Sequence, residues 1–159
     1  MAQQLWLLRH GEAEPHDARP DAERRLTDRG REQSRVAGCA LAALKIQIHV
    51  AFTSPKVRAR DTAELACEPL GVEPIDHAAL FAGFDVSDAL ELLGAAGPDQ
   101  RVLVVGHEPD FSQVVYDLTG ARIDFKKGGI AAVRLDGTSG ELIVLMRPRE
   151  LERICAEAS

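Results

Sequence analysis

The sequence predicts an α/β protein built as a three-layer α/β/α sandwich, with a mainly parallel sheet and an antiparallel hairpin near the C-terminus. Apolar stretches of strand length recur along the chain, and segments of helical periodicity separate the first three of them, which is typical of a parallel sheet covered by helices on both sides. The last two stretches are joined only by the turn-rich Asp136-Gly137-Thr138-Ser139-Gly140, which indicates a hairpin. We expect strands at residues 4–8, 48–53, 101–105, 130–135 and 142–146.

The helices between these strands have recognisable start and stop signals. Thr27 is a good N-cap for a helix that runs to about Leu44. Ser54-Pro55 is expected to cap and open a second helix, which Pro69 ends. Further helices are expected over residues 85–93, 109–120 and 149–158, and a polar loop over residues 12–25.

Length and composition indicate one folded domain over residues 1–159. Hydrophobic residues make up 45% of the chain and charged residues 28%, which is the balance of a globular protein rather than a disordered one. A formal net charge of −6 argues against general nucleic-acid binding, which needs a basic surface. No apolar run approaches the ~20 residues that a membrane span needs, and no signal peptide is evident. We therefore expect neither a nucleic-acid nor a membrane partner.

The three cysteines, Cys39, Cys67 and Cys155, are odd in number and far apart in the sequence. We interpret them as small buried apolar residues rather than as a disulfide or a metal site. A reducing, cytoplasmic environment is the default expectation that follows.

The first apolar run ends in Arg9-His10-Gly11. Ligands of open α/β sheets bind at the carboxyl ends of the strands. Arginine offers a planar fork of donors to phosphoryl oxygens, and histidine can attack phosphorus. The pair alone is a weak signal, because many strands end in charged residues.

Two further strand ends carry matching residues. Arg58 lies one turn into the helix after the second strand, where a helix N-terminus favours anions. His107 follows the third strand in Gly106-His107-Glu108-Pro109. Each residue alone has an ordinary structural explanation, as a surface arginine or a satisfied structural histidine. Their placement at equivalent topological points predicts a phosphoryl site.

The ordered motifs resemble those of the histidine phosphatase (phosphoglycerate mutase-like) superfamily. They are Arg9-His10-Gly11, Leu26-Thr27-Asp28-Arg29-Gly30, Ser54-Pro55-Lys56-Val57-Arg58-Ala59 and Gly106-His107. The short chain and the form of the last motif, Gly106-His107-Glu108-Pro109, resemble the small SixA-type phosphohistidine phosphatases.

The resemblance implies a phosphoglycerate mutase-like fold and a phosphohistidine intermediate on His10. It also implies that Arg9, Arg58 and His107 surround the phosphoryl oxygens, and that no metal or other cofactor is needed. Lys126-Lys127-Gly128-Gly129 does not match a nucleotide-binding loop, and we interpret it as a surface turn.

The general acid is the open part of this interpretation. Glu108 is the best candidate because it adjoins His107, but it is equally suited to capping the following helix; Asp85 and Asp17 are weaker candidates. Residues 69–100 are too few for a sizeable lid, so we expect an open site. Specificity is expected from rim residues, which include His16, Asp17, Arg19 and Lys126.

An open site and an easily displaced leaving group favour phosphohistidine on a protein, such as a histidine-containing phosphotransfer domain, as the substrate. A phosphomonoesterase for a small sugar or nucleotide phosphate is the main alternative. A mutase would need a more enclosed site than this length allows. A non-catalytic phosphate-binding module is the alternative from another class, although a binder has no need of a nucleophile.

Overall fold

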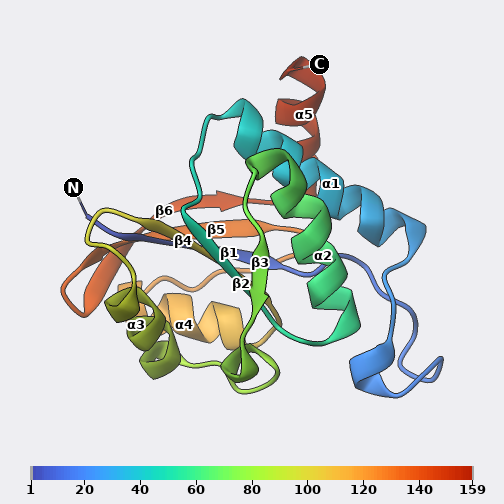
Figure 1. The fold of residues 1–159 in the computed structure, drawn as a ribbon, viewed down its shortest axis with the longest axis horizontal. Coiled ribbons are helices and arrows are strands. Elements are labelled where there is room, and N and C mark those ends of the chain that lie inside the picture. Colours follow the sequence, from blue (N-terminus) through green and yellow to red (C-terminus); the bar gives the residue numbers. More distant parts are fainter. Residues whose placement is uncertain (1, 159) are drawn as a thin grey trace.

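A computed structural model describes residues 2–158, which form a six-stranded mixed sheet between two layers of helices (Figure 1). The strands are β1 (Gln4–Arg9), β2 (Val50–Thr53), β3 (Pro74–Asp76), β4 (Arg101–Gly106), β5 (Ile130–Asp136) and β6 (Ser139–Met146), in the order β3-β2-β4-β1-β5-β6. The first four pair in parallel, whereas β5 runs antiparallel to both β1 and β6. The predicted sandwich, with its C-terminal hairpin, is confirmed.

The helices divide between the two faces of the sheet. They are α1 (Asp28–Ala43), α2 (Val57–Cys67), α3 (Val86–Ala95), α4 (Asp110–Thr119) and α5 (Pro148–Ala158), with short 3₁₀ turns η1 (Asp21–Glu23), η2 (Glu68–Leu70) and η3 (Ala78–Leu80). Helices α1, α2 and α5 cover one face, and α3 and α4 cover the other (Figure 1). Every expected helix is present, with ends that differ by a few residues.

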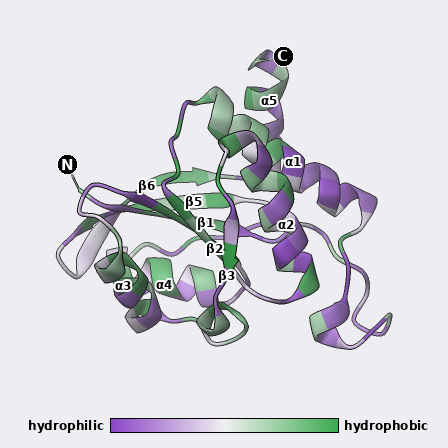
Figure 2. Cartoon of the chain, viewed as in Figure 1, coloured by the Kyte–Doolittle hydropathy of each residue, from purple (hydrophilic) through white to green (hydrophobic). Residues whose placement is uncertain are grey.

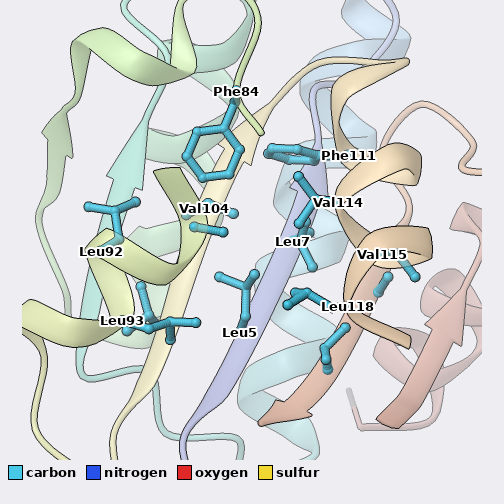
Figure 3. Packing of buried hydrophobic residues seen from close by; sticks show 14 of the residues in the cluster. Leu5, Leu7, Phe84, Leu92, Leu93, Val104, Phe111, Val114, Val115 and Leu118 are labelled. Atoms are coloured by element: carbon cyan, nitrogen blue, oxygen red, sulfur yellow. The ribbon is translucent and has the colours of Figure 1, made fainter. Parts of the chain in front are cut away.

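Each face of the sheet buries its own apolar cluster. Along β1, Leu5 and Leu7 belong to the cluster under α3 and α4, and Trp6 and Leu8 belong to the one under α1, α2 and α5. Figure 3 shows the first cluster, in which side chains from the strands meet those of the two helices. Hydrophobic residues concentrate in the strands, while the outer helix faces are hydrophilic (Figure 2). Because β1 is packed on both faces, its position is fixed, and so is that of His10, the residue that follows it.

Two expectations about the segments around α2 are wrong. Strand β3 was not expected, because it has only three residues and two of them are exposed, so it leaves no apolar run. Helix α2 begins at Val57, with Lys56 in an extended conformation as its N-cap and no side-chain cap. Ser54 therefore does not cap the helix in the way that the sequence suggested.

The prediction for the cysteines is wrong for two of the three. Cys39 in α1 and Cys155 in α5 form a disulfide, with an S–S distance of 2.09 Å. Helix α5 packs on α1 through the fully buried Leu151, which brings together two residues separated by 116 positions. Cys67 is buried and unpaired, as expected. Because disulfides are uncommon in the reducing cytosol, the cysteines no longer support a cytoplasmic location.

Within residues 2–158, no helix is long and apolar enough to cross a bilayer.

Candidate active site

The carboxyl ends of β1, β2 and β4 meet at one edge of the sheet. The parallel register pairs Arg9 with Gly106 and Thr53 with Val105, so the residues that follow these strands are neighbours. The imidazole rings of His10 and His107 lie with their centroids 5.2 Å apart, and each residue is only 7% exposed. Two histidines that are 97 positions apart in the sequence thus share one buried site.

The hydrogen bond of His10 determines which ring nitrogen is free. Its Nδ1 lies 2.7 Å from the carbonyl oxygen of Gly11, and because a carbonyl can only accept, Nδ1 carries the proton. The pKa of His10 is lowered to about 3, mainly by burial and in addition by the positive charges of Arg58 and Arg9, although the Gly11 hydrogen bond acts in the opposite direction. At neutral pH the ring is uncharged, so Nε2 keeps a lone pair that can attack phosphorus.

Two glycines hold the backbone beside His10 in place. A Cβ atom on Gly11 would lie 2.5 Å from the carbonyl oxygen of Gly30, and one on Gly30 would overlap the carbonyl oxygen of Glu12. The amide of Gly11 also donates to Thr62 Oγ1 in α2, at 3.2 Å. The first turn of α1 therefore packs directly on the chain after His10, which explains the glycine in each of the first two motifs.

His107 is oriented by Ser54. The Nε2 atom of His107 lies 2.7 Å from Ser54 Oγ, which also accepts the amide proton of Lys56 at 3.2 Å. We assign the hydroxyl proton to His107 Nε2, which places the ring proton on Nδ1. The pKa of His107 is lowered to about 3, mainly by burial, with smaller contributions from its interaction with His10 and from the charges of Arg58 and Lys56, so this ring is also neutral at pH 7.

The two arginines each use one end of the guanidinium for a fixed contact. Arg9 Nη1 donates to the carbonyl oxygen of Phe125 at 2.7 Å. Arg58 Nη1 donates to the carbonyl oxygen of Asp21 at 2.6 Å, and its Nη2 lies 3.2 Å from Asp21 Oδ2. These contacts hold the two side chains while leaving other donors unused.

Three buried nitrogen atoms at this site have no hydrogen-bond partner among the described residues. They are Arg9 Nε, Arg58 Nε and His107 Nδ1. A buried donor without a partner costs about 1–3 kcal/mol, so such atoms are rare unless a ligand uses them. All three belong to residues that the sequence analysis predicts to bind a phosphoryl group. The oxygens of a phosphoryl group can accept hydrogen bonds from these nitrogen atoms.

Among residues 2–158, no cluster of three or more His, Cys, Asp or Glu residues could hold a metal ion.

Sequence reasoning missed Asp21, whose carboxylate binds three cations. It lies 3.0 Å from Lys56 Nζ, 3.0 Å from Arg24 Nη2 and 3.2 Å from Arg58 Nη2. The hydrogen bond from Lys56, with those from the two arginines, holds the pKa of Asp21 well below its usual range despite some desolvation. Asp21 therefore stays ionised and anchors Arg58. The loop around it has no periodicity that could have marked it.

Sequence reasoning also missed the role of Ser54. The sequence suggested a helix cap, whereas Ser54 contacts His107, which follows β4 and lies 53 positions further along the chain.

The candidate acids are engaged in helix capping or lie on the surface. Glu108 Oε1 accepts the amide proton of Ser112 at 2.7 Å, so the capping alternative is realised in the first turn of α4. Asp85 forms a reciprocal capping box with Asp88 at the start of α3, and Asp17 is exposed on the 12–25 loop. The charge of Glu108 raises the pKa of Arg9, against the larger lowering by burial, so the two side chains interact electrostatically.

The expected rim residues fall into two groups. Lys126 lies with Arg9 in the lining of a cavity of about 660 Å³. Arg19 instead pairs with Glu14 at 2.7 Å, and His16 is exposed. The Lys126–Gly129 segment is a turn, as expected, but it belongs to the site region. The amide of Gly128, at a φ of 76°, donates to the carbonyl oxygens of both Arg9 and His10.

Comparisons with known proteins identify one family. Residues 5–81 match the histidine phosphatase superfamily (branch 1). An uncharacterised protein of Picosynechococcus sp. is 31% identical over 93% of this chain and 98% of its own length. A structure of the protein histidine phosphatase SixA complexed with tungstate is 30% identical, with a TM-score of 0.80 over 93% of this chain and 99% of that chain.

More distant structures share the fold. A putative phosphohistidine phosphatase SixA from Nakamurella multipartitia is 24% identical, with a TM-score of 0.80 over 93% of this chain and 97% of that chain. A putative α-ribazole-5′-P phosphatase from Escherichia coli is 21% identical, with a TM-score of 0.76 over 93% of this chain and 98% of that chain.

Proposed function

This chain belongs to the histidine phosphatase superfamily, in its SixA-type branch, and is a phosphatase; we propose that it removes the phosphoryl group from phosphohistidine on another protein. The observation that carries the proposal is the surroundings of His10. The charges that lower its pKa belong to the cations Arg58, Arg9 and Lys127, while the carboxylate of Glu108 caps a helix. Such a site suits a leaving group that departs without a general acid.

In the first step, His10 Nε2 attacks phosphorus in line and the bond from phosphorus to the substrate imidazole breaks. When the substrate ring is protonated at its other nitrogen, it departs as a neutral imidazole and needs no further proton. An alkoxide from a sugar phosphate would need one. The lone pair on Nε2 becomes the new P–N bond, and His10 becomes phosphohistidine.

The buried donors stabilise the charge on the phosphoryl oxygens during transfer. Arg9, Arg58 and His107 each provide one of the unpartnered nitrogen atoms at the site. Fixed donors of this kind lower the barrier because they need no rearrangement when the equatorial charge develops.

In the second step, water attacks the phosphohistidine and the P–Nε2 bond breaks. The Gly11 carbonyl keeps a proton on Nδ1, so His10 departs as a neutral imidazole, ready for another cycle. Inorganic phosphate is the second product.

A comparison of His10→Asn with the wild-type protein tests the proposal. We expect the wild type to hydrolyse a phosphorylated histidine-containing phosphotransfer domain faster than any member of a sugar-phosphate panel, measured as kcat/KM. Rapid quench with a labelled substrate should trap an acid-labile, alkali-stable phosphate on the wild type and none on His10→Asn. Equal labelling of both proteins, or a preference for the sugar phosphates, would contradict the proposal.

Hydrolysis of small phosphate esters is a second candidate, favoured by Glu108, which directly follows His107 in the chain and whose charge acts on Arg9. Its Oε2 accepts no hydrogen bond from the described residues and is the atom that would carry the proton for an alkoxide. Glu108→Gln separates the two candidates, because it should slow ester hydrolysis while leaving phosphohistidine hydrolysis within about twofold.

A further inference from the structure

A cavity of about 660 Å³ opens beside Arg9 and is lined mostly by cations. The cationic side chains are Arg9, Arg29, Lys126, Lys127, Arg147 and Arg149. Among the described residues of the lining, Glu12 is the one carboxylate. We call this cavity the basic pocket.

The basic pocket adjoins the site of phosphoryl transfer. Arg9 belongs to both, and the turn that carries Lys126 and Lys127 is held to the end of β1 by the Gly128 amide. Lys127 is close enough to His10 to lower the pKa of its ring. A ligand that places its phosphoryl group at His10 therefore has its flanking groups next to these cations.

The charges of the basic pocket are only partly neutralised. Arg29 lies 3.6 Å from Glu12, Lys126 lies 2.8 Å from Asp124, and Glu150 contacts both Arg147 and Arg149 at 2.9 and 3.6 Å. These are exposed pairs, which contribute little and break easily. Lys127 pairs with no carboxylate of residues 2–158. Because the whole chain has a net charge of −6, this excess of positive charge is a local feature.

The exposure of these side chains indicates what kind of anion fits. The side chains of Arg29, Arg147 and Arg149 are 77%, 51% and 76% exposed. Arg29 lies in α1, Arg147 lies between β6 and α5, and Arg149 lies in the first turn of α5. Small metabolites are usually enclosed and bound by rigid polar groups. Long, solvated cations on separate elements instead suit an extended acidic surface, and the acidic remainder of this chain repels such a surface elsewhere.

We propose that the basic pocket binds an acidic segment next to the phosphohistidine of the protein substrate. This inference rests on the proposed function, because it assumes that the substrate is a protein. Its consequence is substrate selection: acidic residues beside the phosphohistidine are expected to lower KM rather than to change the chemical step.

Two phosphohistidine peptides test this, one flanked by glutamates and one by glutamines. The pocket variant is Lys126→Gln/Arg147→Gln/Arg149→Gln. The matched control is Lys45→Gln/Arg134→Gln/Arg153→Gln, which removes the same charge from exposed positions outside the pocket. We expect the wild type and the control to prefer the glutamate peptide by about tenfold in kcat/KM, and the pocket variant to lose this preference. Hydrolysis of p-nitrophenyl phosphate should stay within about twofold in all three proteins.

A binding measurement separates this proposal from the proposed function. A labelled hexaglutamate peptide without phosphate should bind the wild type and the control, by fluorescence anisotropy, about tenfold more tightly than the pocket variant. If neither phosphopeptide is hydrolysed, the proposed function fails while this measurement still decides on the pocket. Equal peptide binding by all three proteins overturns the proposal. Pocket-dependent binding of pyrophosphate without peptide binding also overturns it, in favour of a small anion.

Discussion

The Nδ1 atom of His10 donates a hydrogen bond to the carbonyl oxygen of Gly11 over 2.7 Å. Because the acceptor is the next residue in the chain, the bond does not depend on a side chain that could turn away. It keeps the proton on Nδ1, so Nε2 is the free nucleophile before transfer and the neutral leaving atom afterwards. One backbone contact thus prepares both half-reactions that we propose.

The depressed pKa values of the two histidines predict the response to acid. Burial lowers the pKa of both His10 and His107 to about 3, against about 6.5 for a free imidazole. We expect NMR titration of the folded protein to leave both rings neutral through pH 5. The unfolded chain binds these protons near pH 6.5, so the free energy of unfolding should fall as the pH drops from about 6.5 toward 3. Midpoints of either ring between pH 6 and 7 would contradict this.

Ser54→Ala is expected to impair His107 without removing it. Loss of the hydroxyl leaves His107 Nε2 without its partner and allows the ring proton to move there from Nδ1, which then can no longer donate to a phosphoryl oxygen. We expect kcat to fall roughly 10²-fold, the loss typical when one transition-state donor is removed. The readout specific to orientation is the His107 tautomer, observed through its ¹⁵N shifts.

The control for this experiment is Ser87→Ala, at an exposed position in α3. It should leave both the rate and the His107 tautomer unchanged. An unaltered tautomer in Ser54→Ala would show that Ser54 does not position the ring.

Gly11→Ala is expected to disturb the orientation of His10. The new Cβ would lie 2.5 Å from the carbonyl oxygen of Gly30, so the chain must shift and carry the Gly11 carbonyl away from His10. We expect kcat to fall at least tenfold and the protein to lose about 1–3 kcal/mol of stability, measured by denaturant unfolding. Gly94→Ala in α3, where a Cβ meets nothing within 4 Å, should leave activity unchanged and stability equal or higher. A fully active Gly11→Ala would contradict this account.

The sequence predicted the parts of this molecule that depend on strand order. Apolar runs of strand length mark β1, β2 and β4, and parallel strands must end at a common edge, so residues after them are neighbours. This reasoning brought His10 and His107 together correctly, although their roles remain proposals. Strand β3 could not be predicted from the sequence, because it has three residues of which two are exposed and therefore forms no apolar run.

Other features depend on side-chain direction and on packing between distant elements. The sequence could not reveal that Ser54 turns toward His107 rather than toward its own helix. It could not reveal either that Asp21, in a loop without periodicity, reaches Arg58. The pairing of Cys39 with Cys155 depends on the rotation of α5 on α1, which is decided by how Leu151 is buried.

The disulfide predicts a redox-dependent stability that is separate from catalysis. It closes a loop of 116 positions between α1 and α5, and a bridge of this kind typically contributes about 2–4 kcal/mol. We expect a reductant to lower the melting temperature of the wild type by roughly 4–16 °C. Cys39 lies in the last turns of α1, whereas Gly30 beside the site lies in its first turn, so activity on p-nitrophenyl phosphate at 25 °C should not change.

Cys39→Ser distinguishes the disulfide from other effects of the reductant. Without reductant, this variant should melt where the reduced wild type melts, and adding reductant should not lower its melting temperature further. Because Cys67 is the remaining unpaired cysteine in residues 2–158 and is buried, it provides no second target. A reductant that destabilises wild type and Cys39→Ser equally would show that the bridge does not hold α5 to α1.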